Sequence, residues 1–421
     1  MSCLRRVGFW VVDFLRGSGI RKQYNDIVSK GPNYNNDEDV KRILEYCKQN
    51  IPFYKEITGT GLTDFPVINK QIFKQEGQNC LSSEFVGQKG LYIAQTSGST
   101  GTPLKVYVDR ERKNRSRAEL IIMNNSFGWK VGERYFHIRN WQQGISFPSK
   151  LKRIIQNLVP VPTGNFDKEK KDCLIKQLKR GNNNVIVGYS SSVCDFTNYC
   201  IKTNQANDLK IKLIICDSDE LTDINKNRIE QIFNCDVVNR YSNEENGLLG
   251  YSFKGDNSFH INTASIRMEL LKIDSNEYVD KGEIGRVVIT DLYNRAMPLI
   301  RYDTGDLGIT FDNPCDVHVL NKLVGRISDY LLAINGRKIY EPEICAVFET
   351  LSDIEKYQLI QTNRNEILVK YVGDSEKCET IIKQWLNTIV GDGVIVTFKQ
   401  CEDISKQKSG KYKTIINELN Y

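Results

Sequence analysis

The sequence predicts a layered α/β protein that carries a β-rich subdomain and a small, mobile α+β lobe at its C-terminal end. Two short β-branched runs, Asn184–Gly188 and Lys212–Cys216, are separated by a helical pattern over Cys194–Lys202. This alternation is typical of parallel strands that are buried on both faces and connected by helices. The second observation is the strand-rich pattern of residues 245–325, and the third is the change of pattern after residue 325.

The first 60 residues have a helical pattern. Asn36-Asp37 precedes an amphipathic run that ends before Pro52, which predicts a capped helix. Nearer the start lies a second apolar group, consisting of Phe9, Trp10, Val12 and Phe14. This group is typical of a helix that faces the protein core, and the alternative is a peripheral contact with a membrane surface.

The remaining elements follow from the same periodicities. In the middle of the chain we expect helices at Ala118–Ser126 and Asn225–Phe233, and strands at Gly132–Arg139 and Cys235–Asn239. Beyond residue 325 we expect helices at Glu341–Leu351 and Cys378–Ile389, and strands at Lys356–Thr362, Glu366–Val372 and Val394–Phe398. We therefore predict an N-terminal domain over residues 1–325 and a lobe over residues 326–421, with a hinge at about 326–329.

Composition narrows the classes of protein to consider. The 12 cysteines are scattered and include no Cys-x-x-Cys pair, which is typical of a reduced, cytoplasmic protein. No apolar run approaches the ~20 residues of a membrane span, and Asp13 interrupts the only candidate for a signal peptide. The 3 histidines, His137, His260 and His318, disfavour histidine-based catalytic triads and three-histidine metal sites.

The net charge of +6 is concentrated at one end of the chain. Residues 1–150 hold 23 Lys and Arg against 14 Asp and Glu, and Arg110–Arg117 alone holds five bases and one acid. Such a run is most often the solvated face of a helix, and the alternative is attraction of an anionic ligand or membrane surface. Nucleic acid is not expected as a partner, because the run lacks interleaved aromatic residues for stacking on bases.

The segment that carries the most chemistry is Leu91–Asp109. Its loop, Thr96–Thr102, contains two glycines and five hydroxyl residues between two strand-like runs. Exposed backbone N–H groups and short hydroxyl donors suit a polyphosphate, although a solvated turn has the same composition. The loop lacks the Gly-Lys-Ser/Thr ending of a P-loop and precedes a strand, so a P-loop NTPase is disfavoured.

Four further segments supply groups that suit a nucleotide. Tyr241 and Glu245 follow a strand, where a ring can stack on a base and a carboxylate can hold Mg²⁺. Asp306 lies behind a Thr-Gly turn, and a carboxylate there can accept hydrogen bonds from paired ribose hydroxyls. Arg326 opens the predicted hinge, and Lys411 lies on a basic loop near the C-terminus. Taken singly, each segment also fits an ordinary turn or solvated loop.

In this order, the segments resemble the adenylate-forming superfamily of acyl- and aminoacyl-AMP ligases. The sequences TSGSTGTPLK, IRYDTGD and GR…NGRKIYEPE carry the resemblance. More narrowly, they are similar to its compact branch of phenylacetate–CoA ligases and CapK-type capsule-biosynthesis proteins. The resemblance extends from the glycine-rich loop to Lys411, and the chain length also suits this branch.

The resemblance implies a role for each matching residue. The residues that would bind the ATP phosphates are Thr96, Ser97, Gly98, Ser99, Thr100, Gly101, Thr102 and Lys105. Tyr241 would stack on adenine, and Glu245 would occupy the Mg²⁺-binding position. Asp306 and Arg326 would hold the ribose hydroxyls. Lys411 would bridge the substrate carboxylate and the α-phosphate during adenylation.

Three positions depart from the family pattern. Ser242 stands where the family usually has Gly, and Glu244 where it often has Thr. Ser328 stands where it usually has an Asp or Lys as the hinge pivot. These departures bear on hinge rotation and on whether a second half-reaction follows adenylation.

Two further groups of residues follow from the resemblance. Those expected to line the acid pocket are His137, Gly188-Tyr189-Ser190 and the residues around Asp217–Glu220. Some relatives hold a structural zinc ion near the positions of His260, Cys315 and His318, but the rest of their cysteine pattern is missing here. We therefore expect these three side chains to have core or pocket roles.

Three functions remain open at this point. The first is an ATP-dependent, cytoplasmic ligase that activates a small carboxylic acid as an acyl-AMP and passes it to coenzyme A or another thiol. The second is a CapK-like protein that passes the activated acyl or amino acid to a sugar amine during polysaccharide synthesis. The third is a non-catalytic nucleotide-binding protein. The order of the motifs favours the first.

Overall fold

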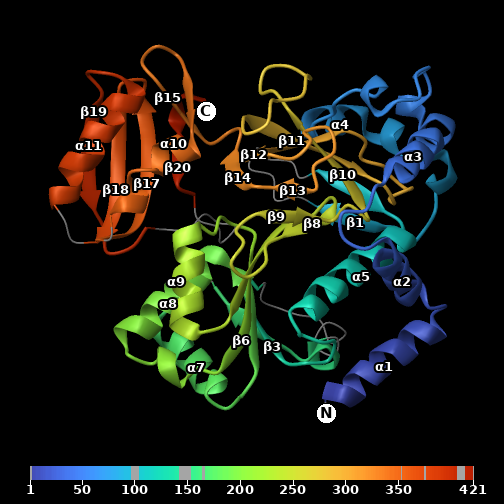
Figure 1. Ribbon diagram of the computed structural model, residues 1–421, viewed down its shortest axis with the longest axis horizontal. Coiled ribbons are helices and arrows are strands. Elements are labelled where there is room, and N and C mark those ends of the chain that lie inside the picture. Colours follow the sequence, from blue (N-terminus) through green and yellow to red (C-terminus); the bar gives the residue numbers. More distant parts are fainter. Residues whose placement is uncertain are drawn as a thin grey trace. The chain divides into compact units, whose positions relative to one another are not determined.

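The computed structural model describes residues 2–95, 104–141, 153–163, 166–351, 353–373, 376–404 and 413–420. The chain divides into two compact units (Figure 1). The first comprises Met1–Thr304 and Ile309–Lys322, and the second comprises Gly305–Gly308 and Leu323–Tyr421. The hinge expected at about 326–329 lies close to this division, and its motion stays a prediction. The α/β fold class is confirmed.

The core of the first unit is an eight-stranded sheet. In spatial order its strands are β13 (Val319–Leu320), β9 (Phe259–Ile261), β8 (Gly247–Tyr251), β7 (Asp236–Asn243), β6 (Ile211–Asp217), β5 (Asn184–Tyr189), β3 (Tyr135–Arg139) and β4 (Leu158–Pro162). The pairs from β4 to β7 are parallel, whereas β8, β9 and β13 are added antiparallel. The strands predicted at 184–188, 212–216 and 235–239 are confirmed as β5, β6 and β7.

Helices cover both faces of this sheet, as Figure 1 shows. The helices of one face are α7 (Lys168–Leu178), α8 (Ser190–Lys202) and α9 (Asp223–Phe233). They pack on side chains such as Ile186 and Ile214. The opposite face, with Val185 and Val187, packs on Met123 of α5 (Arg110–Ser126). Successive residues of β5 therefore point into the apolar cores on opposite faces of the sheet. For this reason the sequence of the strand is an unbroken apolar run.

A second sheet accounts for the predicted β-rich region. Its strands, in spatial order, are β10 (Ile266–Leu271), β11 (Ile284–Asp291), β12 (Tyr302–Ile309) and β14 (Lys322–Arg326). A separate antiparallel hairpin is formed by β1 (Tyr92–Gln95) and β2 (Lys105–Val108). The expectation that a strand follows the glycine-rich loop is confirmed by β2.

The N-terminal segment contains four helices, which are α1 (Ser2–Leu15), α2 (Gly19–Lys30), α3 (Asp37–Asn50) and α4 (Lys70–Glu76). The amphipathic helix predicted after Asn36 is confirmed as α3, but the capping role of Asn36 is wrong because its side chain makes no cap hydrogen bond. Asn36 is buried and donates to the carbonyl oxygens of Thr263 and Ile266 at 2.8 and 2.9 Å. Its side chain therefore joins the start of α3 to the loop before β10.

The second unit is an α+β lobe. Its elements are β15 (Tyr330–Leu332), β16 (Lys338–Tyr340), α10 (Glu341–Cys345), β17 (Ile354–Asn363), β18 (Glu366–Gly373), α11 (Glu376–Val390), β19 (Ile395–Gln400) and β20 (Ile415–Asn417). The main sheet has the order β19-β18-β17-β20. The helix predicted over 341–351 is shorter, because α10 ends at Cys345 and a 3₁₀ turn follows at Phe348–Thr350. Sequence analysis missed the β15–β16 hairpin and β20.

Candidate functional site

The residues assigned to the nucleotide site are divided between the two units. Lys105, Tyr241 and Glu245 belong to the first unit, and Asp306 and Arg326 belong to the second. The loop residues Thr96, Ser97, Gly98, Ser99, Thr100, Gly101 and Thr102 lie outside the described residues, as does Lys411. The described members are therefore considered within their own units.

Lys105 marks the point where the glycine-rich loop ends. It is the first residue of β2, pairs with Gln95 at the end of β1, and is exposed. The hairpin is held by apolar side chains on the following residues, because Val106 and Val108 pack beside Met297 and Leu299. The ends of the loop are thus fixed on a rigid hairpin, with a base at one end.

Tyr241 and Glu245 lie at the carboxyl end of β7 and in the turn that follows it. The Tyr241 ring is buried and contacts Phe259 edge-on at 5.9 Å between centroids. Glu245 accepts a hydrogen bond from the Tyr302 hydroxyl at 3.3 Å, whereas Glu244 is exposed. The structure therefore turns Glu245, rather than its neighbour, toward the segment that contains IRYDTGD.

A buried arginine holds the turn that carries Glu245. Arg112 on α5 donates to the carbonyl oxygen of Asn246 and forms ion pairs with Asp291 at 2.8 Å and Glu119 at 3.0 Å. Burial lowers the pKa of Arg112, but the two carboxylates outweigh burial and raise the pKa above its usual range. Gly247, with φ of +79°, lies next to this arginine, because an added Cβ there would be in ordinary contact with the guanidinium at 3.6 Å. Arg112 thus links α5, β11 and the Glu245 turn.

The basic run that contains Arg112 is not a wholly solvated helix face. Arg115 is also fully buried, stacks on the Tyr293 ring at 3.4 Å and donates to Asp26 at 2.7 Å. The solvated interpretation is therefore wrong for Arg112 and Arg115. One indication of this pairing was present in the sequence. Arg112 and Arg115 are three positions apart, so they lie on the same side of α5.

In the second unit, the two predicted ribose ligands lie together. The Nε of Arg326 lies 3.1 Å from Oδ1 of Asp306, and Asp306 is largely buried whereas Arg326 is exposed. Gly305 has φ of +76°, and its carbonyl oxygen accepts a hydrogen bond from the Ile327 N–H at 2.9 Å. This backbone contact places the start of the predicted hinge beside the Thr-Gly-Asp sequence, which lies within β12 rather than in the turn expected from the sequence.

The predicted hinge pivot has a hydrogen-bonded partner of its own. The Ser328 hydroxyl donates to Asp329 at 3.0 Å, and Asp329 pairs with Lys413 at 3.0 Å. The segment that follows the lysine loop is thereby tied to the turn after β14. A carboxylate lies one position beyond the place where the family usually has its pivot.

The predicted acid-pocket residues share one edge of the eight-stranded sheet. In the parallel register Tyr189 pairs with Asp217, and Ile138 pairs with Gly188, so His137, Tyr189 and Asp217 lie near the carboxyl ends of β3, β5 and β6. Arg240 of β7 reaches across to form an ion pair with Asp217. Ligands of open α/β sheets bind at this edge, so the structure adds Arg240 to the pocket candidates.

His137 is neutral in this environment. Burial is the main reason that the pKa of its imidazole is lowered to about 4. The negative charge of Asp217 raises this pKa, whereas the positive charges of Arg139 and Arg240 lower it. The Nε of Arg240 is buried and has no hydrogen-bond partner among the described residues. The edge therefore offers one unused donor and one uncharged ring.

Of the three residues considered for zinc, His260 and His318 lie on adjacent segments, because the Ile261 N–H donates to the His318 carbonyl, and all three side chains have other partners. His260 pairs with Asp256 at 2.8 Å, and His318 pairs with Asp316 at 3.3 Å. The Cys315 thiol donates to the Asn313 side chain at 3.2 Å. Within the described ranges, no group of three His, Cys, Asp or Glu side chains could hold a metal ion.

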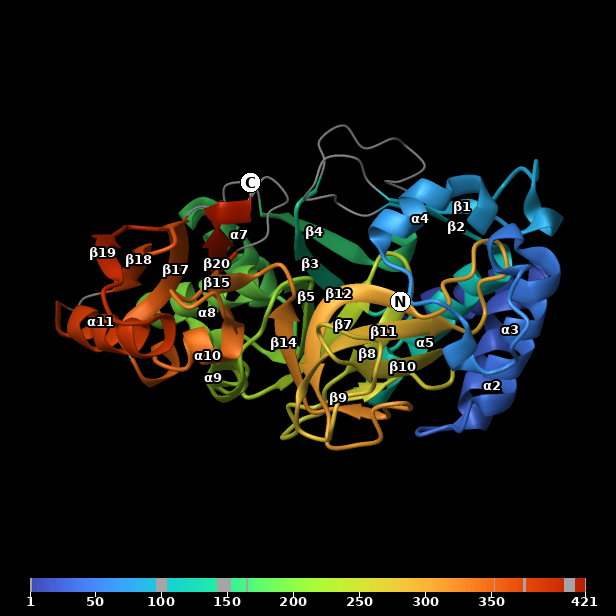
Figure 2. The same cartoon turned by 90° about the horizontal axis from the view of Figure 1, so that it is seen from above.

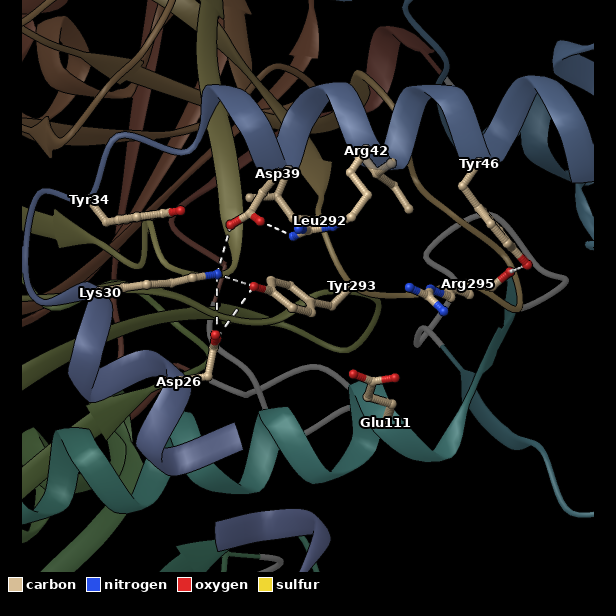
Figure 3. Close-up of a pocket in the computed structure, with 11 residues that line it drawn as sticks. Asp26, Lys30, Tyr34, Asp39, Arg42, Tyr46, Glu111, Leu292, Tyr293 and Arg295 are labelled. Carbon is tan, nitrogen blue, oxygen red and sulfur yellow. Dashed lines mark hydrogen bonds and ion pairs between the residues drawn. The ribbon is translucent and has the colours of Figure 1, made fainter. Parts of the chain in front are cut away.

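A polar cavity of about 410 Å³ lies between α2, α3, α5 and the loop after β11 (Figure 3). At one side of it, the Lys30 ammonium binds Asp39 at 2.7 Å, Asp26 at 3.4 Å and the Tyr293 hydroxyl. The cavity contains none of the residues assigned to the nucleotide site. Its lining instead joins α2, α3 and the start of α5 to the loop that follows β11.

Comparison with known proteins supports the expected resemblance. Residues 331–418 match the CapK C-terminal domain family. Protein CapK of Staphylococcus aureus is 22% identical over 408 residues, covering 90% of this chain and 88% of that protein. The phenylacetate-coenzyme A ligase of Thermus thermophilus is 21% identical over 393 residues, covering 85% and 84%.

Among solved structures, 2-hydroxyisobutyryl-CoA ligase in its postadenylation state, in complex with R3-HIB-AMP, has a TM-score of 0.68. It is 17% identical, and the match covers 93% of this chain and 91% of that chain. The chain resembles the adenylate-forming ligases, in their CapK and phenylacetate–CoA ligase branch. Another structure of that CoA ligase, an open conformation with 2-HIB-AMP and CoA, has a TM-score of 0.55. The adenylate-forming fold and the CapK-type lobe were both expected from the motifs and are confirmed.

Proposed function

We propose that this chain is an ATP-dependent ligase that converts a small carboxylic acid to an acyl-AMP, releases pyrophosphate and passes the acyl group to coenzyme A or another thiol. The observation that carries the proposal is the turn after β7, where Tyr302 of the IRYDTGD segment hydrogen-bonds Glu245 and Arg112 holds the neighbouring carbonyl. Two motifs that the family uses for nucleotide binding are thereby brought together. Similarity to AMP-forming CoA ligases supports the same conclusion.

The chemistry explains why these groups are needed. A carboxylate is a poor electrophile because it is negatively charged and would have to expel oxide. Its attack on the α-phosphorus of ATP makes an anhydride and expels pyrophosphate, while charge builds on phosphoryl oxygens. Backbone donors of Thr96–Thr102 and the ammonium groups of Lys105 and Lys411 would stabilise that charge. No general base is required, in keeping with the few histidines of the chain.

The residues present also fit a magnesium ion. Mg²⁺ in nucleotide sites is commonly held by one or two carboxylates, with phosphate and water oxygens as its other ligands. Glu245 is a partly exposed carboxylate, and one of its oxygens is oriented by the Tyr302 hydroxyl. A bound Mg²⁺ would neutralise phosphate charge, and Glu245 would be its ligand from the protein.

The decisive experiment is a pyrophosphate-release screen against aryl, fatty and amino acids, with and without coenzyme A. With the correct acid, we expect acid-dependent release that is lost in Lys411→Ala and retained in Lys408→Ala, a matched lysine of the same loop. Release that survives Lys411→Ala would remove the role proposed for Lys411. ATP binding without release for any acid would favour the non-catalytic alternative.

The match to the CapK C-terminal domain favours an alternative to the thiol as the acceptor of the acyl group. In this alternative, the activated acyl or amino acid is passed to a sugar amine for polysaccharide synthesis. The departures at Ser242 and Ser328 concern the step after adenylation, so they leave the acceptor open. Acyl-AMP consumption that is accelerated by amino sugars and unaffected by coenzyme A would decide for the amine.

We also propose a cytoplasmic location, where ATP and coenzyme A are available, with peripheral contact to a membrane through the N-terminus. All 12 cysteines are free, as expected in a reducing compartment. No helix within the described ranges is both long enough and apolar enough to cross a membrane. We assign the membrane contact to the exposed surface of α1.

A further inference from the structure

We propose that α1 is a docking helix that lies on an anionic membrane surface. Five apolar side chains on its outer side are between 50% and 76% exposed, and they are Leu4, Val7, Val11, Phe14 and Leu15. At 100° per residue they occupy an arc of about 100°, which is the width of the stripe that an ordinary surface helix turns toward the core. A Cβ added at Gly8 would meet no atom within 4 Å outside its own helix turn, so this position also faces open space. Figure 1 shows α1 at the periphery of the first unit.

The opposite side of α1 holds the helix in place. Trp10 contacts Tyr24 of α2 edge-on at 6.0 Å between centroids, and the Arg21 guanidinium lies 3.8 Å from the Trp10 ring. Asp13 is buried and accepts hydrogen bonds from the backbone N–H groups of Ile20 and Arg21 at 3.0 and 2.9 Å. The helix is therefore anchored without its outer apolar side chains, and packing within the first unit does not account for them.

The charges around this helix select the partner. The first 22 residues contain five bases and one acid, and the acid, Asp13, is turned inward to cap α2. Arg5 and Arg16 lie near opposite ends of the helix. Two copies of the chain that met through this helix would each contribute a segment with five bases and one acid, so the two segments would repel each other. An anionic lipid surface would accept both the apolar side chains and the bases.

A second apolar pair lies on the segment that approaches the start of α1. Ile154 and Ile155 are both more than half exposed, and the nearby Asn157 side chain donates to the Gly132 carbonyl at 3.1 Å. Gly132 has φ of +88°, and an added Cβ would lie 2.8 Å from the Ser2 carbonyl oxygen. Gly132, to which Asn157 is hydrogen-bonded, therefore packs closely against the first turn of α1.

The inference does not depend on the proposed ligase activity, and its test is separate. Full-length protein is sedimented with vesicles of pure phosphatidylcholine or of phosphatidylcholine with 40 mol% phosphatidylglycerol. We expect binding to the anionic vesicles that weakens at least about tenfold in Val7→Glu/Val11→Glu and declines with salt. The matched control is Val86→Glu/Ile224→Glu, which alters two valine or isoleucine side chains of similar exposure, and it should bind like the native chain.

Three outcomes would overturn the proposal. The first is equal binding by Val7→Glu/Val11→Glu and its control, and the second is equal binding to both lipid compositions. The third is a native dimer that becomes monomeric in Val7→Glu/Val11→Glu while vesicle binding is unchanged. The last result would assign the face to a second copy of the chain. Should the glutamates unfold α1, as judged by circular dichroism, Phe14→Ser/Leu15→Ser provides the same comparison with uncharged residues.

Discussion

Replacing Arg112 by methionine tests whether the buried ion network supports the candidate site. Methionine fills most of the volume but leaves the carboxylates of Asp291 and Glu119, each 1% exposed, without the guanidinium that neutralises them. Removing one partner of a buried ion pair costs about 3–5 kcal/mol. The first unit has about 320 residues, and its unfolding entropy is roughly 0.7 kcal/mol per kelvin, so we expect a melting temperature lower by about 4–8 °C.

The assay is thermal unfolding followed by circular dichroism, with Arg110→Met as the control on the same helix. Arg110 is exposed and donates one hydrogen bond, to the Arg16 carbonyl at 2.9 Å, so its replacement should cost less than about 0.5 kcal/mol. Neutralising the stranded acids, in Arg112→Met/Glu119→Gln/Asp291→Asn, should recover part of the loss. The reasoning is refuted if Arg112→Met melts within 1 °C of the Arg110 control.

Three further outcomes are expected. Because burial holds the pKa of His137 near 4, against 6.5 for an ordinary imidazole, the unfolded chain gains a proton that the folded chain does not as pH falls from 6.5 to 4. Stability should therefore decline over that interval and be flatter in His137→Gln, as measured by urea unfolding at several pH values. Asp306→Asn should raise the KM for ATP about tenfold, since a charged hydrogen bond is lost, with no change in melting temperature beyond a few degrees. Iodoacetamide should label exposed Cys3 and Cys173 first, and Cys47, whose thiol pKa is raised by burial, only after unfolding, as mapped by mass spectrometry.

Local patterns were sufficient for the parts of the fold that depend on neighbouring residues. The alternating strands and helices around β5 and β6 were predictable because each strand is buried on both faces and each helix repeats its apolar stripe. The glycine-rich loop was recognisable because its glycine and hydroxyl residues lie between two strand-like runs. These two runs form the β1–β2 hairpin in the structure. The β15–β16 hairpin was missed because its strands have three residues each, too few to show a period.

The errors concern polar residues whose partners are distant in sequence. Arg112 lies 179 positions from Asp291, so nothing in the basic run could show that its charge would be buried and paired. Asn36 has the right residue type for a helix cap, but its side-chain oxygen accepts a hydrogen bond from Arg267, 231 positions away, instead of from the first turn of α3. Residue type predicted a polar role in each case, and tertiary structure selected the partner.

The IRYDTGD segment shows why a motif residue can be both a binding residue and a structural one. Arg301, with φ of +48°, is buried against Glu269, and the next residue, Tyr302, turns its hydroxyl toward Glu245. Asp306 then meets Arg326 in the second unit. A variant in this segment therefore changes folding and ligand binding together. A loss of activity at Tyr302 implicates Glu245 only if Tyr302→Phe keeps the native melting temperature, because phenylalanine preserves the buried ring and removes the hydroxyl alone.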